Sequence, residues 1–462
     1  MNQARLFCSF RDPSGFVFYD NGRLLRQVNL GYKQNYDFLI NSGLYEKLSS
    51  EGLLVPHIEI KSKLSDNGYK VIEPFQIPFI SYSYEWSFSQ LKQAALTTIK
   101  IQRTALKYGM SLKDSSSYNI QFIGTKPVFI DTLSFEIYPQ NKPWIAYRQF
   151  CQHFLAPLAL MSYKNINLSQ MLKSYLEGIS LSMAASLLSA NSWFNLGLLI
   201  HLHLHAKSQG DYSNLDTSKI NINKKSFTIN ALYGLLDSLE SVVSKLNINV
   251  SSSQWSDYYF EKKSYTKLAL EHKQKIIEGF FYKSGLNRVL DLGANTGFFS
   301  RIAAKTNRYT ISSDYDPMCV EVNYRLLIKD NCENILPLVL DVTNPTPAIG
   351  WQGKERFSLF ERSSSDLVMA LALVHHLAIS NNLPFDKIAD FFTQIAQELI
   401  IEFVPKDDAM VQSLLRLRED IFQDYTQENF EKSFRKNFDI LEMVFIADSK
   451  RILYLMRRRN EK

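Results

Sequence analysis

The stretch from Arg288 to Ser300, RVLDLGANTGFFS, restricts the possible folds of this chain more than any other segment. Its first residues predict a buried strand, and GANTG predicts a tight turn that leads directly into a helix. A second strand pattern, YTISSD, ends at Asp314, which lies 23 residues after Asp291. A strand, a glycine turn at a helix N-terminus and an acid at the tip of the next strand together form half of a nucleoside-binding fold.

The turn is poorer in glycine than a pyrophosphate cradle. A dinucleotide fingerprint reads G-x-G-x-x-G, whereas only Gly293 and Gly297 are present here, with Asn295 between them. The glycines let the backbone approach a ligand, and the Asp314 carboxylate can accept hydrogen bonds from both hydroxyls of a ribose. In these features the segment resembles motifs I and II of the class I S-adenosylmethionine-dependent methyltransferases.

Strand and helix patterns alternate from Arg288 to the C-terminus. Helices are predicted between all the strands except the last two, so we expect five parallel strands and a closing antiparallel pair. This α/β order resembles the Rossmann-like seven-stranded methyltransferase sheet. The predicted strands are Val289–Leu292, Tyr309–Asp314, Ile335–Leu340, Asp366–Ala372, Leu399–Val404, Phe438–Ile446 and Arg451–Met456.

The resemblance implies a cofactor, S-adenosyl-L-methionine, and a role for each residue of the motifs. Asp291 and the turn from Gly293 through Asn295 to Gly297 would lie under the methionine part of the cofactor. Asp314 would bind the ribose, and Asp341, 27 residues further on, would contact the adenine amino group. Tyr265, in the aromatic lead-in to the first strand, would close over the bound cofactor.

The catalytic half of the site is less clearly defined. His375 and His376 follow the fourth strand, where the resemblance implies a position facing the methyl group. Either histidine deprotonates the acceptor, or the pair only orients the loop through hydrogen bonds. Glu402, on the fifth strand, is a second candidate. The motifs that mark methylation of a nucleic-acid base are missing, so we expect a small-molecule or protein acceptor and no nucleic-acid partner.

The N-terminal part begins with a β-hairpin that turns at Asp20-Asn21-Gly22. A helix is predicted over Asn35–Leu48, strands over Leu54–Ile60 and Tyr69–Ile80, and a long helix over Ser87–Met110, which Ser87 can cap. A second hairpin, NIQF and PVFI, turns at Gly124. These elements predict an α+β domain.

Asp114, Asn119 and Asp131 surround that second hairpin. Their spacing resembles the catalytic and metal-binding loops of the protein-kinase-like and aminoglycoside-phosphotransferase-like families. The resemblance implies Asp114 as a base and Asn119 and Asp131 as magnesium ligands, with ATP as the nucleotide. The glycine-rich loop and the nucleotide lysine are missing, and Arg26 is the nearest replacement, so we expect a degenerate, pseudokinase-like domain. In the alternative interpretation the acids only cap turns.

Length and composition favour several domains in an ordinary globular protein. We expect an N-terminal domain over residues 1–206, a linker and connecting helix over 207–250, and the methyltransferase domain over 251–462. The net charge of +6 is spread along the chain, and the four cysteines form no C-x-x-C pair. We expect no metal site, because the histidines of HLHLHA have no carboxylate partner nearby. No signal peptide or membrane span is apparent, which predicts a cytoplasmic protein.

Over nearly its full length the chain is similar to a bacterial family of class I methyltransferases with a long N-terminal extension, some of them nodulation-related. SYEWSFSQLK, LKDSSSYN, PVFIDTLSFE and PWIAYRQFCQHFLAPLALM carry this similarity. It implies methyl transfer from S-adenosylmethionine to an unidentified acceptor. The alternatives are a non-catalytic scaffold with two degenerate enzyme folds, or a phosphotransferase that uses the N-terminal domain. The oligomeric state stays open.

Overall fold

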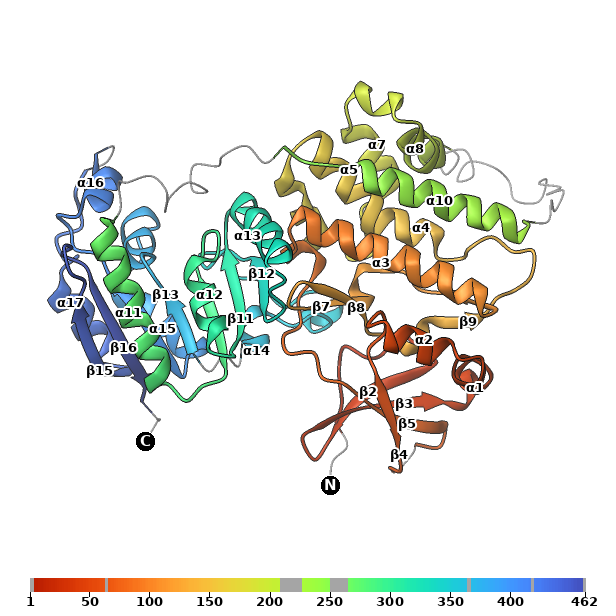
Figure 1. Ribbon diagram of the computed structural model, residues 1–462, viewed down its shortest axis with the longest axis horizontal. Coiled ribbons are helices and arrows are strands. Elements are labelled where there is room, and N and C mark those ends of the chain that lie inside the picture. The colour runs from red at the N-terminus through yellow and green to blue at the C-terminus, as the bar shows by residue number, and fades with distance from the viewer. Residues whose placement is uncertain are drawn as a thin grey trace. The chain divides into compact units, whose positions relative to one another are not determined.

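The computed structural model describes residues 4–62, 65–207, 227–249, 265–363, 367–416 and 419–459. The chain divides into two compact units (Figure 1). The first comprises Met1–Asn249 and Ile349–Arg356, and the second comprises Val250–Ala348 and Phe357–Lys462. Each unit has its own sheet and its own buried apolar core. No helix among the described residues has both the length and the apolar character needed to cross a membrane.

The second unit is built on a seven-stranded sheet with the order β12-β11-β10-β13-β14-β16-β15. β10 lies between β11 and β13 and is parallel to both, whereas β16 runs antiparallel to β14 and β15. The strands are β10 Arg288–Leu292, β11 Tyr309–Asp314, β12 Ile335–Val339, β13 Leu367–Ala370, β14 Glu398–Phe403, β15 Phe438–Phe445 and β16 Ile452–Arg458. The predicted α/β methyltransferase sheet is therefore confirmed.

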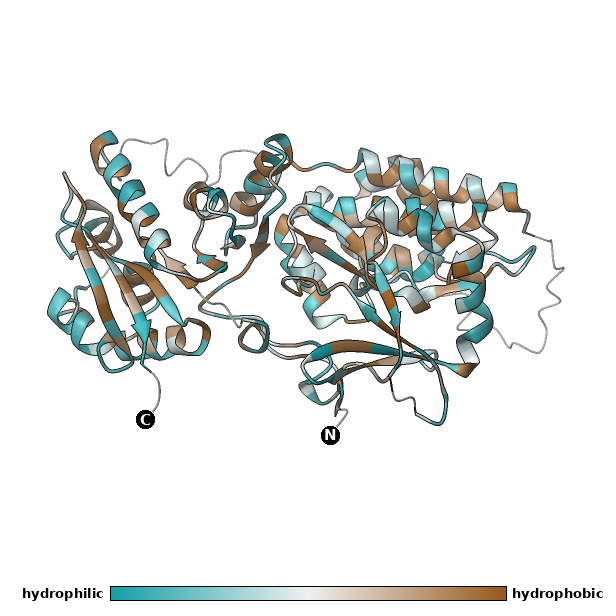
Figure 2. Cartoon of the chain, turned by 60° about the horizontal axis from the view of Figure 1, so that its bottom comes forward, coloured by the Kyte–Doolittle hydropathy of each residue, from teal (hydrophilic) through white to brown (hydrophobic). Residues whose placement is uncertain are grey.

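Helices connect these strands, and buried apolar side chains join them to the sheet. Ile277 and Phe280 of one helix and Phe299 of the next belong to the same core cluster as Val289 and Met369 of the sheet. Figure 2 shows that the middle of these strands is largely apolar. The helices are α11 Lys267–Lys283, α12 Phe298–Lys305, α13 Pro317–Lys329, α14 Leu359–Arg362, the π-helix η11 His376–Ser380, α15 Phe385–Ile395, α16 Ala409–Leu415 and α17 Gln427–Phe434.

Two strand boundaries in this unit differ from the predicted ones by two residues, and the other differences are of one residue. β13 ends at Ala370, two residues early, because Ala372 has a φ of +49°, which no strand residue adopts. The predicted start of that strand, Asp366, lies outside the described residues. β16 continues to Arg458, two residues beyond the predicted end, because Arg457 still pairs with Glu398 of β14.

The first unit begins with a five-stranded antiparallel sheet of order β1-β2-β3-β5-β4. Its strands are β1 Ala4–Arg5, β2 Gly15–Asp20, β3 Arg23–Asn29, β4 His57–Ile60 and β5 Gly68–Pro74. The helix predicted over Asn35–Leu48 is broken into α1 Lys33–Asn41 and α2 Leu44–Ser50, because Gly43 adopts a left-handed φ of +81° between them.

A mostly helical part follows the five-stranded sheet. Ser87 caps α3 Phe88–Lys107 as predicted, accepting a hydrogen bond from the Gln90 amide. Two short antiparallel pairs follow, β6 Met110–Leu112 with β9 Phe135–Ile137, and the hairpin of β7 Ile120–Ile123 with β8 Lys126–Phe129. The remaining helices include α4 Tyr147–Phe150, α5 Ala156–Tyr163, α6 Met171–Ser174, α7 Leu181–Leu187, α8 Leu196–Leu198 with the π-helix η8 Leu199–Leu204, and α10 Ile229–Lys245.

The connecting helix α10 packs on α3 within the first unit. Arg103 of α3 pairs with Asp237 and Glu240 of α10, each at 2.6 Å. Residues 208–226 of the expected linker, between η8 and α10, lie outside the described part of the chain.

Candidate functional site

The glycine turn joins the carboxyl end of β10 to α12. The Ala294 amide donates to the Ser313 carbonyl at 2.9 Å, which ties the turn to the neighbouring strand β11. Gly297 precedes the first residue of α12 and has a φ of +78°. A Cβ atom built on Gly297 would lie 2.4 Å from the Asn323 Oδ1 atom. Glycine is therefore required at this position both by its backbone conformation and by the space available.

We expect Gly297→Ala to lower the free energy of unfolding by about 1–3 kcal/mol, because a Cβ is disfavoured at this φ and overlaps Asn323. Chemical denaturation followed by circular dichroism measures the change. Gly285→Ala is the matched control, since a Cβ at that position would meet no atom within 4 Å and its φ is not positive. Equal midpoints for the two variants would contradict this account of the turn.

Asp314 ends β11 with its carboxylate fixed by two backbone amides. Its Oδ2 accepts from the Asn295 amide at 2.8 Å, and its Oδ1 accepts from the Asp316 amide at 2.9 Å. The side chain is 7% exposed, and burial raises its pKa to about 6. The carboxylate is therefore preorganised, with lone pairs left to accept further hydrogen bonds.

Asp291 lies deeper than Asp314, at the end of β10. Its Oδ2 accepts from the Ser300 hydroxyl at 2.6 Å, and burial raises the pKa of this carboxyl to about 7. The Ser300 hydroxyl also contacts the Ser312 hydroxyl at 2.8 Å. Asp291 thus lies beneath the glycine turn and stabilises it through the hydrogen bond with Ser300.

A cavity of about 410 Å³ opens beside Asp314. It lies at the carboxyl ends of β10, β11, β12 and β13, where the strand order reverses and where open α/β sheets bind ligands. Its size suits a nucleoside-sized molecule. The lining residues are Gly293, Asn295, Asp314, Tyr315, Leu340, Asp341, Val342, Thr343, Leu371, Ala372, Leu373, His376, Leu377, Ser380, Asn381 and Leu414.

Four of the seven predicted cofactor residues meet in this cavity: Gly293, Asn295, Asp314 and Asp341. Asp341 stands at an exposed position, and its Oδ1 accepts from the Thr343 amide at 2.8 Å and the Thr343 hydroxyl at 2.6 Å. Its Oδ2 is left for a ligand at the rim.

The facing wall is formed by the loop after β13 and by η11. Ala372 in this loop is held at a φ of +49°, a strained conformation for a residue with a Cβ, and such strain is common at ligand sites. His376 and Ser380 lie four residues apart and both line the cavity. Burial lowers the pKa of His376 to about 4, so its ring is neutral at physiological pH.

His375 is turned away from the cavity and is fully buried. Neither ring nitrogen has a hydrogen-bond partner, and the ring lies 4.2 Å from that of His376. Burial holds its pKa well below the usual value, and the charges of Arg451 and Lys273 act in the same direction. His375 is therefore a neutral packing residue behind His376.

Glu402 belongs to a buried charge network and is not among the residues that line the cavity. Its Oε2 accepts from Lys273 Nζ at 2.6 Å, and its Oε1 accepts from the Tyr265 hydroxyl at 2.6 Å. Although burial opposes it, the charges of Lys273 and Arg451 hold the pKa of Glu402 below its usual value. Because Glu402 does not line the cavity, this geometry gives no support to the expectation of Glu402 as a catalytic base.

Tyr265 is held by the same network. Its hydroxyl accepts from Lys273 Nζ at 2.8 Å and from Arg451 Nη1 at 2.6 Å, and Arg451 in turn binds Asp408. Tyr265 does not line the cavity in this structure, so the expected closure over a cofactor is replaced here by a contact with Glu402.

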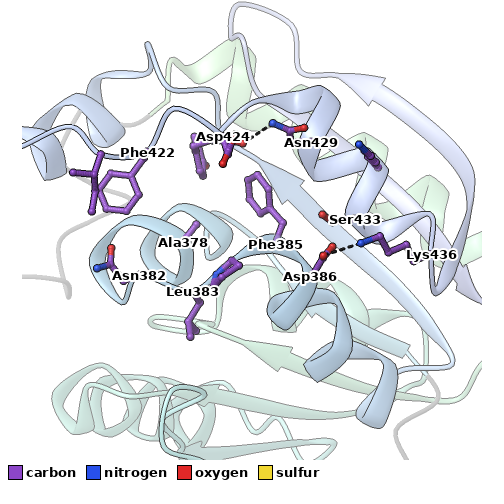
Figure 3. A pocket seen from close by; sticks show the side chains of 14 residues that line it. Ala378, Asn382, Leu383, Phe385, Asp386, Phe422, Asp424, Asn429, Ser433 and Lys436 are labelled. Atoms are coloured by element: carbon purple, nitrogen blue, oxygen red, sulfur yellow. Dashed lines mark hydrogen bonds and ion pairs between the residues drawn. The ribbon is translucent and has the colours of Figure 1, made fainter.

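A separate groove of about 580 Å³ is lined in part by Ala378 of η11 (Figure 3). Phe385 lies at its centre, and Asp386 pairs with Lys436 at 2.7 Å along one side. Ala378 of η11 faces this groove, whereas Leu377 and Ser380 of the same helix face the first cavity. η11 therefore separates the two hollows, and the acids of the predicted site belong to the first.

The side chains predicted to resemble a kinase site, in the first unit, make local contacts. Asp131 pairs with Arg26 at 2.5 Å, its Oδ2 accepts from the Ser134 hydroxyl at 2.6 Å, and its Oδ1 accepts from the Leu133 amide at 3.0 Å. Asn119 donates to the same Ser134 hydroxyl at 3.2 Å, and Asp114 accepts from the Ser116 amide at 2.9 Å. This is the capping arrangement that the alternative interpretation predicts.

No group of three or more histidine, cysteine, aspartate or glutamate side chains in the described parts of the chain is placed to hold a metal ion. The histidines of HLHLHA make ordinary packing contacts. His201 hydrogen-bonds with the Tyr147 and Ser238 hydroxyls, each at 2.8 Å, and His203 with the Ser192 hydroxyl at 2.8 Å.

Sequence reasoning missed Ser380 and Asn381 of the cavity, and Tyr315 beside Asp314. Ser380 had a usable signal, because it follows His376 by four residues and so shares its face of a helix. Lys273 and Arg451 were also missed. They lie 178 residues apart in sequence, and nothing local to either one indicates that they meet at Glu402.

Comparisons with known proteins gave one curated relative and several weak structural likenesses. The chain is 34% identical to the nodulation protein NoeA of Rhizobium meliloti (strain 1021) over 463 aligned residues, which cover 98% of this chain and 96% of that protein. A scan against protein-family models found no match.

Among solved structures, the bifunctional kinase-methyltransferase WbdD aligns with 47% of this chain at 13% identity and a TM-score of 0.32. This chain spans less than half of the length of WbdD, 45%. The N-methyltransferase NodS from Bradyrhizobium japonicum aligns with 42% of this chain and 98% of its own at 11% identity and a TM-score of 0.31. These structural likenesses are too weak to carry an argument about this chain.

Proposed function

The chain belongs to the family of the nodulation protein NoeA, and from this membership and the geometry of the cavity we propose that it is an S-adenosylmethionine-dependent methyltransferase. The observation that carries the proposal is the Asp314 carboxylate at the tip of β11. Two backbone amides fix it at the wall of a nucleoside-sized cavity, at the switch point of a methyltransferase-ordered sheet.

The residues present fit this cofactor. The Asp314 carboxylate would accept hydrogen bonds from the ribose hydroxyls, and Asp341 at the rim would accept one from the adenine amino group. Leu340 and Leu377 give apolar walls for the base, and Tyr315 offers an aromatic ring next to them. Gly293 leaves room for the amino-acid end. When bound, the cofactor would supply an electrophilic methyl group on its sulfonium.

His376 is the residue best placed to assist at the acceptor. It lines the cavity, and with a pKa of about 4 its ring is neutral and able to accept a hydrogen bond from the acceptor at pH 7. A base this weak contributes mainly by orienting the acceptor, so most of the rate enhancement would come from positioning the two reactants. His375 supports the position of His376 from behind.

The affinity for S-adenosylhomocysteine, the demethylated cofactor, should fall as the pH drops below about 6. Burial raises the pKa of Asp314 to about 6, and ribose binding requires the ionised carboxylate. Binding is therefore at full strength above this pKa and weakens as the carboxyl takes up a proton. Calorimetry between about pH 5 and 8 measures this change, and in Asp314→Asn the pH dependence should disappear. A pH-independent affinity in the natural protein would contradict the ribose role.

Transfer of a labelled methyl group tests the proposed activity. The protein is incubated with cofactor labelled on its methyl group and with fractions of a bacterial extract, separated into small molecules, proteins and nucleic acids. We expect label in the small-molecule or protein fraction, and none with Asp314→Ala. If no fraction is labelled while the protein still binds the cofactor, the chain is a binding protein and not a transferase.

A further inference from the structure

One part of the first unit exposes an unusual number of large apolar side chains. They occur in the segment from α7 to the end of η8, and their exposed fractions run from 42% for Leu187 to 89% for Phe194. Exposed apolar residues are ordinary when they are scattered, but a contiguous group marks an interaction site. We call this group the 187–204 face; its members are Leu187, Trp193, Phe194, Leu196, Ile200 and Leu204.

Three members form a stripe along one helical surface. Leu196, Ile200 and Leu204 follow each other at intervals of four residues through α8 and η8, and they are 68%, 44% and 50% exposed. Leu198 and Leu202, on the opposite side, are fully buried. The three exposed residues of the stripe are therefore not part of the core of the first unit.

The 187–204 face is held in a defined shape. The Trp193 ring stacks on His203, with centroids 4.2 Å apart, and His203 hydrogen-bonds with Ser192. Underneath, Gly197 lies so close to Val242 of α10 that a Cβ atom added to this glycine would be 2.6 Å from the Val242 Cβ. Figure 1 shows α7 and α8 beside α10 at the edge of the helical part. A preformed surface loses little conformational entropy on binding.

The charge of the segment indicates what covers it. From Gly178 to Ala206 the sequence contains no aspartate, glutamate, lysine or arginine. Across a two-fold axis a surface meets its own copy, so any charge near the axis faces a like charge, and a charge-free surface avoids this repulsion. A helix that lies on an anionic membrane instead carries lysine or arginine beside its apolar face. The segment from Gly178 to Ala206 contains no lysine and no arginine.

We propose that the 187–204 face docks against the same face of a second copy of this chain, giving a two-fold symmetric dimer. The inference does not depend on the proposed methyltransferase activity. A second exposed apolar strip, Leu441, Met443 and Phe445 on the edge strand β15, begins next to the exposed Asp439 and has Glu442 within its sequence. Charges on an edge strand oppose pairing with a second copy, so this strip is the less suitable one.

Sedimentation velocity on the full chain, from about 1 to about 100 µM, tests the proposal. We expect a concentration-dependent species of twice the 53.4 kDa chain mass. Phe194→Asp and Ile200→Asp should each raise the dissociation constant at least about tenfold, because each places a charge in an apolar contact. Both positions are exposed in the single chain, and unchanged melting temperatures will show that the variants fold.

Met443→Asp is the matched control, since it places the same charge in the other apolar strip, and it should leave the dimer unchanged. The proposal is overturned if the natural chain stays monomeric over this range, or if Met443→Asp dissociates the dimer while Phe194→Asp does not. Phe194-dependent co-sedimentation of a monomer with phosphatidylcholine vesicles would also overturn it, because the face would then belong to a lipid surface.

Discussion

Replacing Lys273 with methionine should lower the free energy of unfolding of this protein by about 3–5 kcal/mol. Lys273 and Glu402 are 1% and 0% exposed, and their Nζ and Oε2 atoms lie 2.6 Å apart. Methionine fills a similar volume but removes the positive charge. The Glu402 carboxylate then stays buried with only the Tyr265 hydroxyl and the more distant Arg451, whose Nη1 is 3.7 Å away.

Chemical denaturation of the natural chain and the variant measures this change. Lys283→Met is the matched control. Lys283 also pairs with a glutamate, Glu442, but its side chain is 58% exposed, and such pairs contribute at most about 1 kcal/mol. In the double variant Lys273→Met with Glu402→Gln we expect part of the lost stability to return, because no unpaired charge is left at Glu402. Equal losses in Lys273→Met and Lys283→Met would contradict the buried network.

Replacing Asp314 with alanine should weaken S-adenosylhomocysteine binding at least about 100-fold. A hydrogen bond to a charged group contributes about 1.5–3 kcal/mol, so the loss of two ribose contacts exceeds the roughly 2.7 kcal/mol that corresponds to this factor. Isothermal titration calorimetry of the variant and the natural chain gives the two dissociation constants directly.

Asp439→Ala is the control for that titration, because Asp439 is an exposed carboxylate on β15, away from the cavity-lining residues. Its affinity for S-adenosylhomocysteine should be unchanged. A melting curve of Asp314→Ala separates lost binding from lost folding. If this variant folds and binds as tightly as the natural chain, Asp314 does not hold the ribose.

The sheet and one side of the site could be predicted because their signals are local. The strands RVLDL and YTISSD are buried along almost their whole length, as expected for parallel strands that are covered on both faces, and the acids near their ends lie at one edge of the sheet. The resemblance that these strands carry implied Asp314 and Asp341 as contacts of one ligand, and both line the same cavity. Asp291 carries the same signal, but its side chain lies under the turn, against Ser300.

The other side of the site depends on contacts that no local pattern encodes. η11 is a π-helix, and the loop before it turns at Ala372, a residue that rarely adopts a positive φ. Glu402 was predicted as a catalytic candidate from its place on the fifth strand, and Tyr265 was predicted over the cofactor from its resemblance to the aromatic lead-in of the methyltransferases. Instead, Glu402 and Tyr265 bind Lys273 and Arg451, which are distant in sequence, in a buried network.

The acidic residues of the N-terminal domain are a second case in which a local pattern did not predict the contacts. From the sequence, Arg26 was the nearest replacement for the nucleotide-binding lysine. In the structure Arg26 forms an ion pair with Asp131. Ser134 and the Leu133 amide bind the same carboxylate, so both of its oxygens accept hydrogen bonds within the first unit. The nucleoside site that we propose lies instead in the second unit, in the cavity beside Asp314.

Titration of the natural chain with S-adenosylhomocysteine tests this account most directly, because every assigned role depends on a nucleoside in the cavity beside Asp314. The account predicts one molecule bound per chain, with micromolar or tighter affinity at pH 7, and no competition from ATP with magnesium. The absence of any binding heat at several temperatures, or displacement of the ligand by ATP, would contradict it.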